Sequence, residues 1–552
     1  MRRIALVIIL CLGAFLRLYL LPSLPPSLTW DEASWGYNAY SISIDGKDEF
    51  GRFFPITYLE SFGDYKPPVY AYLTAPFVKL LGLNELSVRL PSALLGVATV
   101  LLTYLLTKKI FTSASENKRE TIALLSSGIL AISPWHIMLS RAAFEANVAT
   151  FFIVLGTFLF LVSLEKRWIL PFSVLSFILS MYTFNTARVF VPLFGTFLLT
   201  FYLKDLLRDK KNLLISLGLG LFLFLPLFFF LLTPQAQLRY REVNIFSDPS
   251  VVITANREIE NDGNALWSKI IHNRRVGYGL SYIKHYLDNF DPLFLFTRGD
   301  GNPKFSIQDV GQLYIWEIPF FVFGILFLFR KREGFFLIVP FWILLGIVPA
   351  AVARETPHAL RIETILPTFQ ILSAYGLYHF FEFFRNKSFR INLFTPLVLI
   401  VGFLVIFNLL YFLHNYTVHY PREYSNEWQY GYREAMEYVS LNKNSYENIY
   451  FTEGLGRPYI YFLFHSKYPP SSFRNNSTVY KDAAGFIHVA RIDNIFFQED
   501  LHKGVDILAK NLFIGEPGKL PAKIKILKQF RKLDGQVVLV AYERNIQDEK
   551  LK

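Results

Sequence analysis

Residues 1–21, MRRIALVIILCLGAFLRLYLL, decide the class of fold. Two arginines precede an apolar run long enough to cross about 30 Å of hydrocarbon, and no small-residue cleavage site follows it. We therefore expect an uncleaved first membrane helix. Arg17 lies near the outer end of this helix, where its charge must either reach the interface or meet an internal anion.

The composition of the whole chain supports this interpretation. Of 552 residues, 53% are hydrophobic and only 18% are charged, which is too apolar for an ordinary soluble protein of this length. The formal charge of +12 does not indicate nucleic acid as a partner, because the basic residues sit in short clusters at the ends of apolar runs. Cys11 is the only cysteine, so no intramolecular disulfide can form.

Apolar runs of spanning length recur along the chain, which predicts an α-helical polytopic membrane protein. We expect about eleven membrane helices, near residues 4–21, 86–107, 121–139, 147–164, 168–184, 188–203, 212–233, 312–329, 335–353, 362–383 and 392–413.

Basic residues between these runs fall mainly on one side, for example in the pairs Lys108–Lys109 and Lys210–Lys211. The positive-inside rule then places the N-terminus in the cytoplasm of a multi-pass plasma-membrane protein. With an odd number of spans, three large pieces face outward: residues 22–85, 234–311 and 414–552.

These pieces differ in character. Residues 66–82, KPPVYAYLTAPFVKLLG, are apolar but short and broken by proline, so we expect a helix in the membrane interface. The loop 234–311 is long enough to be a functional cover. The tail mixes helix-like and strand-like segments, which predicts a small extracytoplasmic α/β domain at 414–552 after a transmembrane module at 1–413.

Charged and polar side chains gather at the predicted outer ends of the helices. The stretch TWDEASWGYNAY, residues 29–40, carries adjacent acids, and other outer loops carry arginines, a lysine and a histidine. Arg and Lys can neutralise a phosphate, and a carboxylate can take a proton from an attacking hydroxyl. This set suits transfer of a sugar from a lipid phosphate. The residues concerned are Asp31, Glu32, Asp64, Lys66, Arg141, Glu145, Tyr182, Asn185, Arg188, Arg354, His358 and Arg361.

Each of these residues also has a purely structural interpretation. Asp31 and Glu32 follow Thr29 at the start of a plausible helix, where acids act as caps. Arg354, His358 and Arg361 can anchor a span end at the interface. Lys66 precedes two prolines and can simply begin the interfacial helix.

A resemblance favours the functional interpretation. The order of DEA after the first helix, then KPPVYAYLTAPFVKLLGLNELSVRLPSALLGVATVLLTYLL, SPWHIMLSRAAFEANVATFF and PHALRIETILPTFQILSAYGL, resembles the C-type (GT-C) membrane glycosyltransferases. Within these, the chain is similar to the protein O-mannosyltransferase and aminoarabinose transferase superfamily of the family 39 kind.

The resemblance implies a role for most of these residues. Asp31 matches the catalytic carboxylate, with Glu32 completing an acidic pair. Lys66 of the KPP segment implies a contact to the donor phosphate, as do Arg188, Arg354, His358 and Arg361. Glu145 stands where the family has aspartate, and it is grouped with Arg141 and Asp64 as residues that orient the acceptor or the base. Tyr65 replaces the glutamate that precedes KPP in the aminoarabinose branch, which argues against a lipid A substrate.

The predicted reaction is a single inverting displacement on a polyprenyl-phosphate sugar in the lipid bilayer. The acceptor is a protein hydroxyl, a glycan or a glycolipid, and nothing in the tail selects among them. The sequence has no HExxH or His/Cys cluster for zinc, while the acids leave a divalent ion possible. A transporter or flippase is the main alternative, since charges also line transport pathways. An inactive assembly protein of the same ancestry is another.

Overall fold

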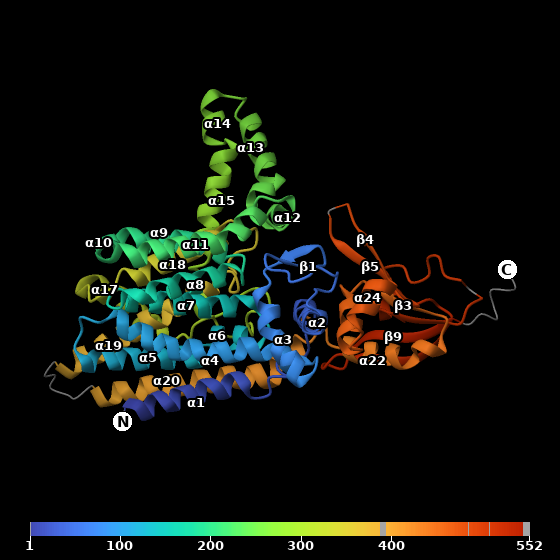
Figure 1. The fold of residues 1–552 in the computed structure, drawn as a ribbon, viewed down its shortest axis with the longest axis horizontal. Helices are drawn as coiled ribbons and strands as arrows, with labels where there is room; N and C mark the ends of the chain where they lie inside the picture. The colour runs from blue at the N-terminus through green and yellow to red at the C-terminus, as the bar shows by residue number, and fades with distance from the viewer. Residues whose placement is uncertain (1, 387–393, 484, 507, 545–552) are drawn as a thin grey trace. The chain divides into compact units, whose positions relative to one another are not determined.

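The computed structural model describes residues 2–386, 394–483, 485–506 and 508–544 (Figure 1). The chain forms two compact units. The first, here called the helical unit, comprises Met1–Tyr19, Ser92–Ser140 and Phe144–Leu413. The second, called the mixed unit, comprises Leu20–Pro91, Arg141–Ala143 and His414–Lys552.

The helical unit is built from apolar helices packed side by side. The closest pair is α17 and α19, where glycines replace larger side chains at the contact. A Cβ at Gly324 would lie 2.0 Å from the Leu372 carbonyl oxygen, and one at Gly376 only 1.8 Å from that of Phe320. Small residues let two membrane helices approach this closely. The helices are α1 (Arg2–Leu18), α4 (Glu85–Ile110), α5 (Glu116–Ile132), α6 (Pro134–Arg141), α7 (Glu145–Ser163), α8 (Leu170–Met181), α9 (Ala187–Phe201), α10 (Leu203–Leu206), α11 (Lys210–Leu231), α17 (Glu317–Lys331), α18 (Ile338–Ala351), α19 (Thr368–Asn386) and α20 (Phe394–His414).

The structure confirms a helical membrane fold but not the expected number of spans. Within the described residues, four helices are long and apolar enough to cross a membrane, or five if the pair α5 and α6, bent by 55°, is one span. Three predicted spans correspond to apolar helices of 10–17 residues, at Arg167–Met181, Ala187–Phe201 and Ile338–Ala351. A crossing needs about 20 helical residues, so an apolar run overstates the length of straight helix. Residues 392 and 393 of the last predicted span lie outside the described residues.

Arg17 lies inside the helical unit and does not reach its surface. Its side chain is fully buried and donates hydrogen bonds to the carbonyls of Leu130 and Ala131, at 3.1 and 3.0 Å. It also donates to His136 Nδ1, 2.6 Å away. These carbonyls belong to the last turn of α5, which ends at Ile132, and the backbone N–H of Ser133 also donates to that of Leu130 at 3.3 Å. The guanidinium therefore helps to cap the C-terminal end of α5.

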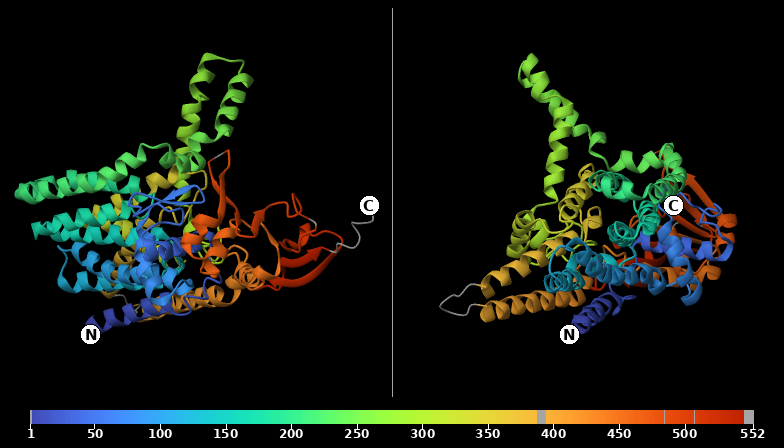
Figure 2. Two further views of the ribbon diagram at one scale, coloured as in Figure 1. Left: turned by 45° about the vertical axis from the view of Figure 1, so that its right-hand side comes forward. Right: turned by 60° about the vertical axis from the view of Figure 1, so that its left-hand side comes forward.

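The predicted cover after α11 consists of short helices. It contains α12 (Pro234–Val243), α13 (Pro249–Asn261), α14 (Leu266–Ile271), α15 (Arg274–Asp288) and α16 (Pro292–Phe296). Helices α13, α14 and α15 form a hairpin that projects from the helical unit (Figure 2). Helix α14 ends at Ile271, and α15 begins after Asn273, whose side chain caps α15 by accepting from Arg275 N at 2.9 Å.

The mixed unit contains a seven-stranded sheet with the order β4-β5-β6-β3-β7-β9-β8. Its centre, β6-β3-β7, is parallel, and the flanking strands are antiparallel. Tyr450, Phe513 and Tyr542 stack across β3, β7 and β9 with ring centroids 5.3 Å apart in each pair. The predicted α/β tail is therefore present. Its elements are α22 (Tyr432–Asn442), β3 (Asn448–Thr452), α23 (Pro458–His465), α24 (Pro470–Asn476), β4 (Ser477–Lys481), β5 (Ile487–Ile492), β6 (Ile495–Gln498), β7 (Asn511–Gly515), β8 (Ile524–Arg531) and β9 (Val537–Arg544).

The first loop packs on this tail within the mixed unit. The loop forms α2 (Trp30–Asp45), the hairpin of β1 (Leu59–Ser61) and β2 (Asp64–Lys66), and α3 (Val69–Leu81). Gly36 of α2 lies so close to α23 that a Cβ there would be 2.5 Å from the Phe464 ring. Residues 20–91 thus belong to the same compact unit as residues 414–552. The predicted division between residues 413 and 414 instead places 20–91 with the transmembrane helices. The division into a catalytic module and an extracytoplasmic domain stays a prediction.

Candidate functional site

The start of α2 is fixed by a capping box. Thr29 Oγ1 accepts from Glu32 N at 3.2 Å, and Glu32 Oε2 accepts from Thr29 N at 3.0 Å. Two otherwise unpaired N–H groups of the helix terminus are satisfied reciprocally. The capping interpretation is therefore correct for Thr29 and Glu32, while Asp31 stands between them without taking part in the box.

Glu32 is held in addition by a buried ion pair with Arg89. Arg89 Nε lies 2.8 Å from Oε1 and the second guanidinium nitrogen 3.2 Å from Oε2, with both side chains at most 1% exposed. Ala143 N also donates to Oε1 at 3.0 Å. The remaining Arg89 donors reach the carbonyls of Leu21 and Pro25 at 3.1 and 2.8 Å. With its oxygens committed in this way, Glu32 acts as a structural junction.

Asp31 differs from its neighbour in exposure and in partner. Its side chain is 48% exposed and forms an ion pair with Lys66, whose side chain is only 9% exposed. Lys66 ends β2, where it is paired with Leu59 of β1. The structure therefore brings together two residues 35 positions apart in the sequence, as the functional interpretation expected.

Aromatic rings surround the lysine of this pair. The Lys66 ammonium lies 5.3 Å from the ring centroid of Trp35 and 5.0 Å from that of Phe62. Cation–π attraction stabilises the charge in a place that water hardly reaches. The arrangement presents one accessible carboxylate beside one shielded cation, which suits proton abstraction next to a bound anion.

Two predicted orienting residues of the mixed unit lie in different settings. Asp64 lies two positions before Lys66 on β2, so the pleat directs both side chains to the same face of the hairpin. Arg141 is buried, donating to Tyr416 Oη at 3.2 Å and to the Leu24 carbonyl at 3.1 Å. Its contacts join three segments of the mixed unit.

The helical unit carries the other predicted residues. Glu145 is the first residue of α7, where the partial positive charge of the helix terminus favours a carboxylate. Arg188, near the start of α9, donates to the Met181 carbonyl at 3.2 Å and lies over the Phe230 ring. Tyr182 Oη donates to the Leu223 carbonyl at 2.8 Å. Asn185, which is exposed, lies in the turn before α9.

Arg354, His358 and Arg361 share the loop between α18 and α19. Arg354 is exposed and donates to the Asn244 carbonyl at 3.1 Å. Arg361 donates to the Glu355 carbonyl at 2.8 Å. His358 is buried, and this burial, with the nearby Arg361 charge, lowers its pKa to about 3. The imidazole is therefore neutral at pH 7 and can contact a phosphate only as a hydrogen-bond donor.

Asp300, which the sequence reasoning missed, holds this loop in place. It accepts from Ala359 N at 2.6 Å and from Asn302 N at 2.8 Å, and one of its oxygens lies 3.9 Å from His358 Nδ1. Burial raises its pKa to about 6. The only sequence signal was a Gly-Asp-Gly turn within a loop rich in such residues.

Glu49 is a second residue that the sequence did not single out. It is fully buried beside Asp48, and neither of its carboxyl oxygens has a hydrogen-bond partner among the described residues. Burial first, and then the Asp48 charge, raise the pKa of Glu49 well above its usual value, although Lys66 opposes the shift. The carboxyl group therefore holds its proton more strongly in the folded protein than in the unfolded chain.

Across the described part of the chain, no three His, Cys, Asp or Glu side chains come together in a way that could hold a metal ion.

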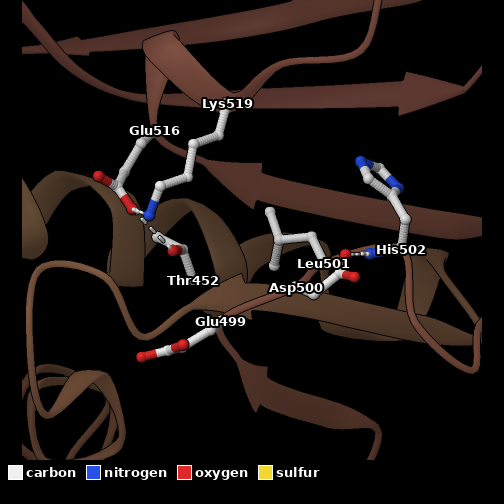
Figure 3. Close-up of a pocket in the computed structure, with 7 residues that line it drawn as sticks. All are labelled: Thr452, Glu499, Asp500, Leu501, His502, Glu516 and Lys519. Carbon is white, nitrogen blue, oxygen red and sulfur yellow. Dashed lines mark hydrogen bonds and ion pairs between the residues drawn. The ribbon is translucent and has the colours of Figure 1, made fainter.

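A separate pocket opens at the carboxyl ends of the parallel strands (Figure 3). Glu516 accepts from Lys519 Nζ at 2.9 Å and from Thr452 Oγ1 at 3.3 Å. Crevices at this edge of α/β sheets commonly bind ligands. Its lining residues are Thr452, Glu499, Asp500, Leu501, His502, Glu516 and Lys519.

Comparison with known proteins agrees with this architecture. Residues 65–230 match the sequence profile of the family described as dolichyl-phosphate-mannose-protein mannosyltransferase. The structure of ArnT from Cupriavidus metallidurans bound to undecaprenyl phosphate has a similar fold, with a TM-score of 0.53 and 11% identity over 98% of this chain and 97% of that chain. The resemblance to the C-type membrane glycosyltransferases is confirmed. In this chain the profile match begins at Tyr65 and includes Lys66, Glu145 and Arg188.

Two curated relatives match part of this chain. An uncharacterized protein of Aquifex aeolicus (strain VF5) is 33% identical over 189 residues, which is 32% of this chain and 36% of that protein. YkcB of Bacillus subtilis (strain 168), a mannosyltransferase by name, is 29% identical over 152 residues, or 28% of this chain and 20% of YkcB. The chain thus spans about a third and a fifth of the length of these relatives.

The buried pair makes a direct prediction about stability. Glu32→Gln leaves the Arg89 charge buried without its counter-ion, which should cost about 3–5 kcal/mol. We expect a large fall in the melting temperature of the purified protein, measured by thermal unfolding in detergent. Asp31→Asn is the matched control, the same chemical change one residue earlier at a half-exposed site, and it should leave the melting temperature nearly unchanged. Equal shifts for the two variants would contradict the junction role of Glu32.

The raised pKa of Glu49 predicts a pH-dependent stability. A carboxyl whose pKa is higher in the folded state lowers the free energy of unfolding as pH rises above its unfolded value of about 4.3. Glu49→Gln removes this effect, so its melting temperature relative to that of the wild type should rise as the pH is raised above about 4.3. Glu434→Gln, at an exposed position of the same unit, is the control, and its melting temperature should differ from that of the wild type by the same amount at every pH. A difference between Glu49→Gln and the wild type that also stays constant with pH would refute the prediction.

Proposed function

We propose that the protein is a membrane glycosyltransferase that moves a sugar from a polyprenyl-phosphate donor to an acceptor hydroxyl at the outer face of the membrane. The observation that carries the proposal is the ion pair between half-exposed Asp31 and shielded Lys66. The C-type fold supports it, and so does the undecaprenyl phosphate bound in the ArnT structure. The outward position of the site follows from the positive-inside pattern.

In the proposed reaction, Asp31 takes the proton of the acceptor hydroxyl as the oxygen attacks the anomeric carbon. The bond from that carbon to the phosphate oxygen breaks, and the configuration inverts. Lys66 neutralises the phosphate that departs with the lipid. Because an arriving phosphate competes with Asp31 for the Lys66 ammonium, donor binding frees the carboxylate to act as a base.

The other predicted residues take supporting roles in this proposal. Arg188, Arg354 and Arg361 are assigned to the donor head, since their guanidinium groups keep a permanent charge. His358 is assigned there as a neutral hydrogen-bond donor. Glu145 and Asp64 are assigned to orienting the acceptor, while Glu32 and Arg141 support the site through their buried contacts.

The tail is proposed to help select the acceptor through the pocket at Glu499 and Glu516. Carboxylates and a threonine hydroxyl accept hydrogen bonds from sugar hydroxyls, and the pocket is open to solvent. Deleting the tail cannot test this idea, because α2 packs on α23 in the same compact unit. Point changes in the pocket leave that packing intact.

Asp31 and Lys66 are tested by turnover of a polyprenyl-phosphate sugar. Asp31→Asn should lower kcat by about 10²–10⁴-fold, the usual contribution of a positioned base. Lys66→Ala should lower kcat and raise the donor KM, because it contacts the phosphate before and during departure. Release of polyprenyl phosphate, measured by chromatography of the lipid product, gives both values.

The same assay separates the proposal from its alternatives. Full transfer by folded Asp31→Asn would remove the proposed base, and movement of the intact lipid without sugar transfer would indicate a flippase. Activity should survive EDTA, since the proposed steps use side chains. Loss of activity that added metal restores would overturn this part of the mechanism.

The acceptor pocket makes a separate prediction. Glu499→Gln and Glu516→Gln should each raise the acceptor KM several-fold by weakening hydrogen bonds to hydroxyls, while the donor KM stays constant. Glu434→Gln, an exposed acid on α22, is the control and should change neither value. Unchanged acceptor KM in both pocket variants would remove the pocket from acceptor selection.

A further inference from the structure

Helix α15 presents its polar side to the protein and its apolar side outward. Tyr282 and Tyr286 donate hydrogen bonds to carbonyls of α18, at 3.4 and 2.8 Å. His285 Nδ1 lies 2.8 Å from the carbonyl oxygen of Ala353. A helix on the surface of a soluble protein has the opposite polarity.

The outward side of α15 is an aliphatic stripe. Val276, Leu280, Ile283 and Leu287 follow a spacing of four, three and four residues and are 41%, 63%, 55% and 59% exposed. That spacing puts them on one face of the helix. A contiguous exposed apolar stripe marks a surface that interacts with a membrane or with another protein.

Helix α14 also exposes large apolar side chains. Leu266, Trp267, Ile270 and Ile271 are 78%, 55%, 66% and 56% exposed. Residues 265–284 contain no acid, and their charges are all basic, at Lys269, Arg274, Arg275 and Lys284. Aliphatic residues, a tryptophan and basic side chains together are typical of helices that lie in a membrane interface.

The direction of the hairpin agrees with an interfacial position. Figures 1 and 2 show α13 and α15 running across the direction of α5 and α11 within the helical unit. Helix α11 belongs to a segment that qualifies as a span, Leu203–Leu231, and the hairpin follows its end. If α11 runs along the membrane normal, α15 runs along the membrane plane. At 15 residues α15 is about 22 Å long, too short to cross.

We propose that the hairpin of α13, α14 and α15, residues 249–288, inserts the apolar side chains of α14 and α15 into the outer leaflet of the lipid bilayer. The bilayer fits better than a protein partner because the span that leads into the hairpin, Leu203–Leu231, also turns its apolar side chains outward: only 22% of its apolar window is buried. The basic residues match anionic lipid headgroups.

The insertion has a consequence for the loop that carries Arg354, His358 and Arg361. The C-terminal end of α15 is bonded to that loop: Thr356 Oγ1 donates to Asp288 at 2.9 Å, and His358 N donates to Asn289 Oδ1 at 3.3 Å. A hairpin seated in the leaflet fixes the depth of this loop against the lipid headgroups. This consequence alone rests on the proposed function, whereas the insertion itself does not.

Spin labelling tests the insertion on the full-length protein. Cys11 is the only cysteine, so Cys11→Ser gives a background for single labels at Leu280→Cys, Ile283→Cys and, as a control on exposed polar surface of α13, Glu260→Cys. The labelled protein is reconstituted into vesicles of phosphatidylethanolamine and phosphatidylglycerol. Collision of each nitroxide with oxygen, which partitions into lipid, is compared with collision with a water-soluble nickel chelate.

We expect the ratio of oxygen to nickel collisions at 280 and 283 to exceed that at 260 several-fold. Equal ratios at the three positions would overturn the proposal. So would dipolar broadening at 280 that disappears on dilution with unlabelled protein, because a second copy would then cover the stripe. If one of the variants at positions 280 and 283 folds poorly, the label at the other position decides the test. The collision ratio does not depend on transferase activity.

Discussion

The buried ion pair between Glu32 and Arg89 is the constraint on which the site depends. One carboxylate closes the capping box of α2, neutralises Arg89 and accepts from Ala143 N, while Arg89 binds the carbonyls that precede α2. Four chain segments are thereby held at one point. Because Glu32 makes all of these buried contacts, Asp31 can remain half-exposed and pair with Lys66.

Buried side chains also fix the backbone of the loop 352–366 in the helical unit. Buried Asp300 and Asn289 hold its backbone through Ala359 N and His358 N. The arginines of the loop also contact backbone carbonyls, Arg354 that of Asn244 and Arg361 that of Glu355. In both units, buried acidic or amide side chains fix the backbone beside charged residues that the proposal assigns to the substrate.

Sequence reasoning recovered the membrane fold and the α/β tail, and it singled out Asp31 and Lys66, which the structure pairs. It failed where a residue's role depends on a partner far away in the chain. Arg89 lies inside an apolar run, and nothing local indicates that Glu32 is its partner. Glu49 and Asp300 are ordinary loop acids in the sequence, and only burial makes them unusual. The expected number of spans is not confirmed, because apolar runs continue through turns and short helices, and four or five described helices have the length and composition of a span.

By itself, the sequence determined that the chain enters a membrane and that acids, a lysine and arginines collect near the ends of its helices, because hydropathy and charge clusters are local properties. Tertiary structure alone decided which of two adjacent acids is available for chemistry. Helix capping allows either residue, but only the position of Arg89 makes Glu32 the buried partner and leaves Asp31 to Lys66. Exposure and pairing are properties of the packed chain, and no short stretch of sequence contains them.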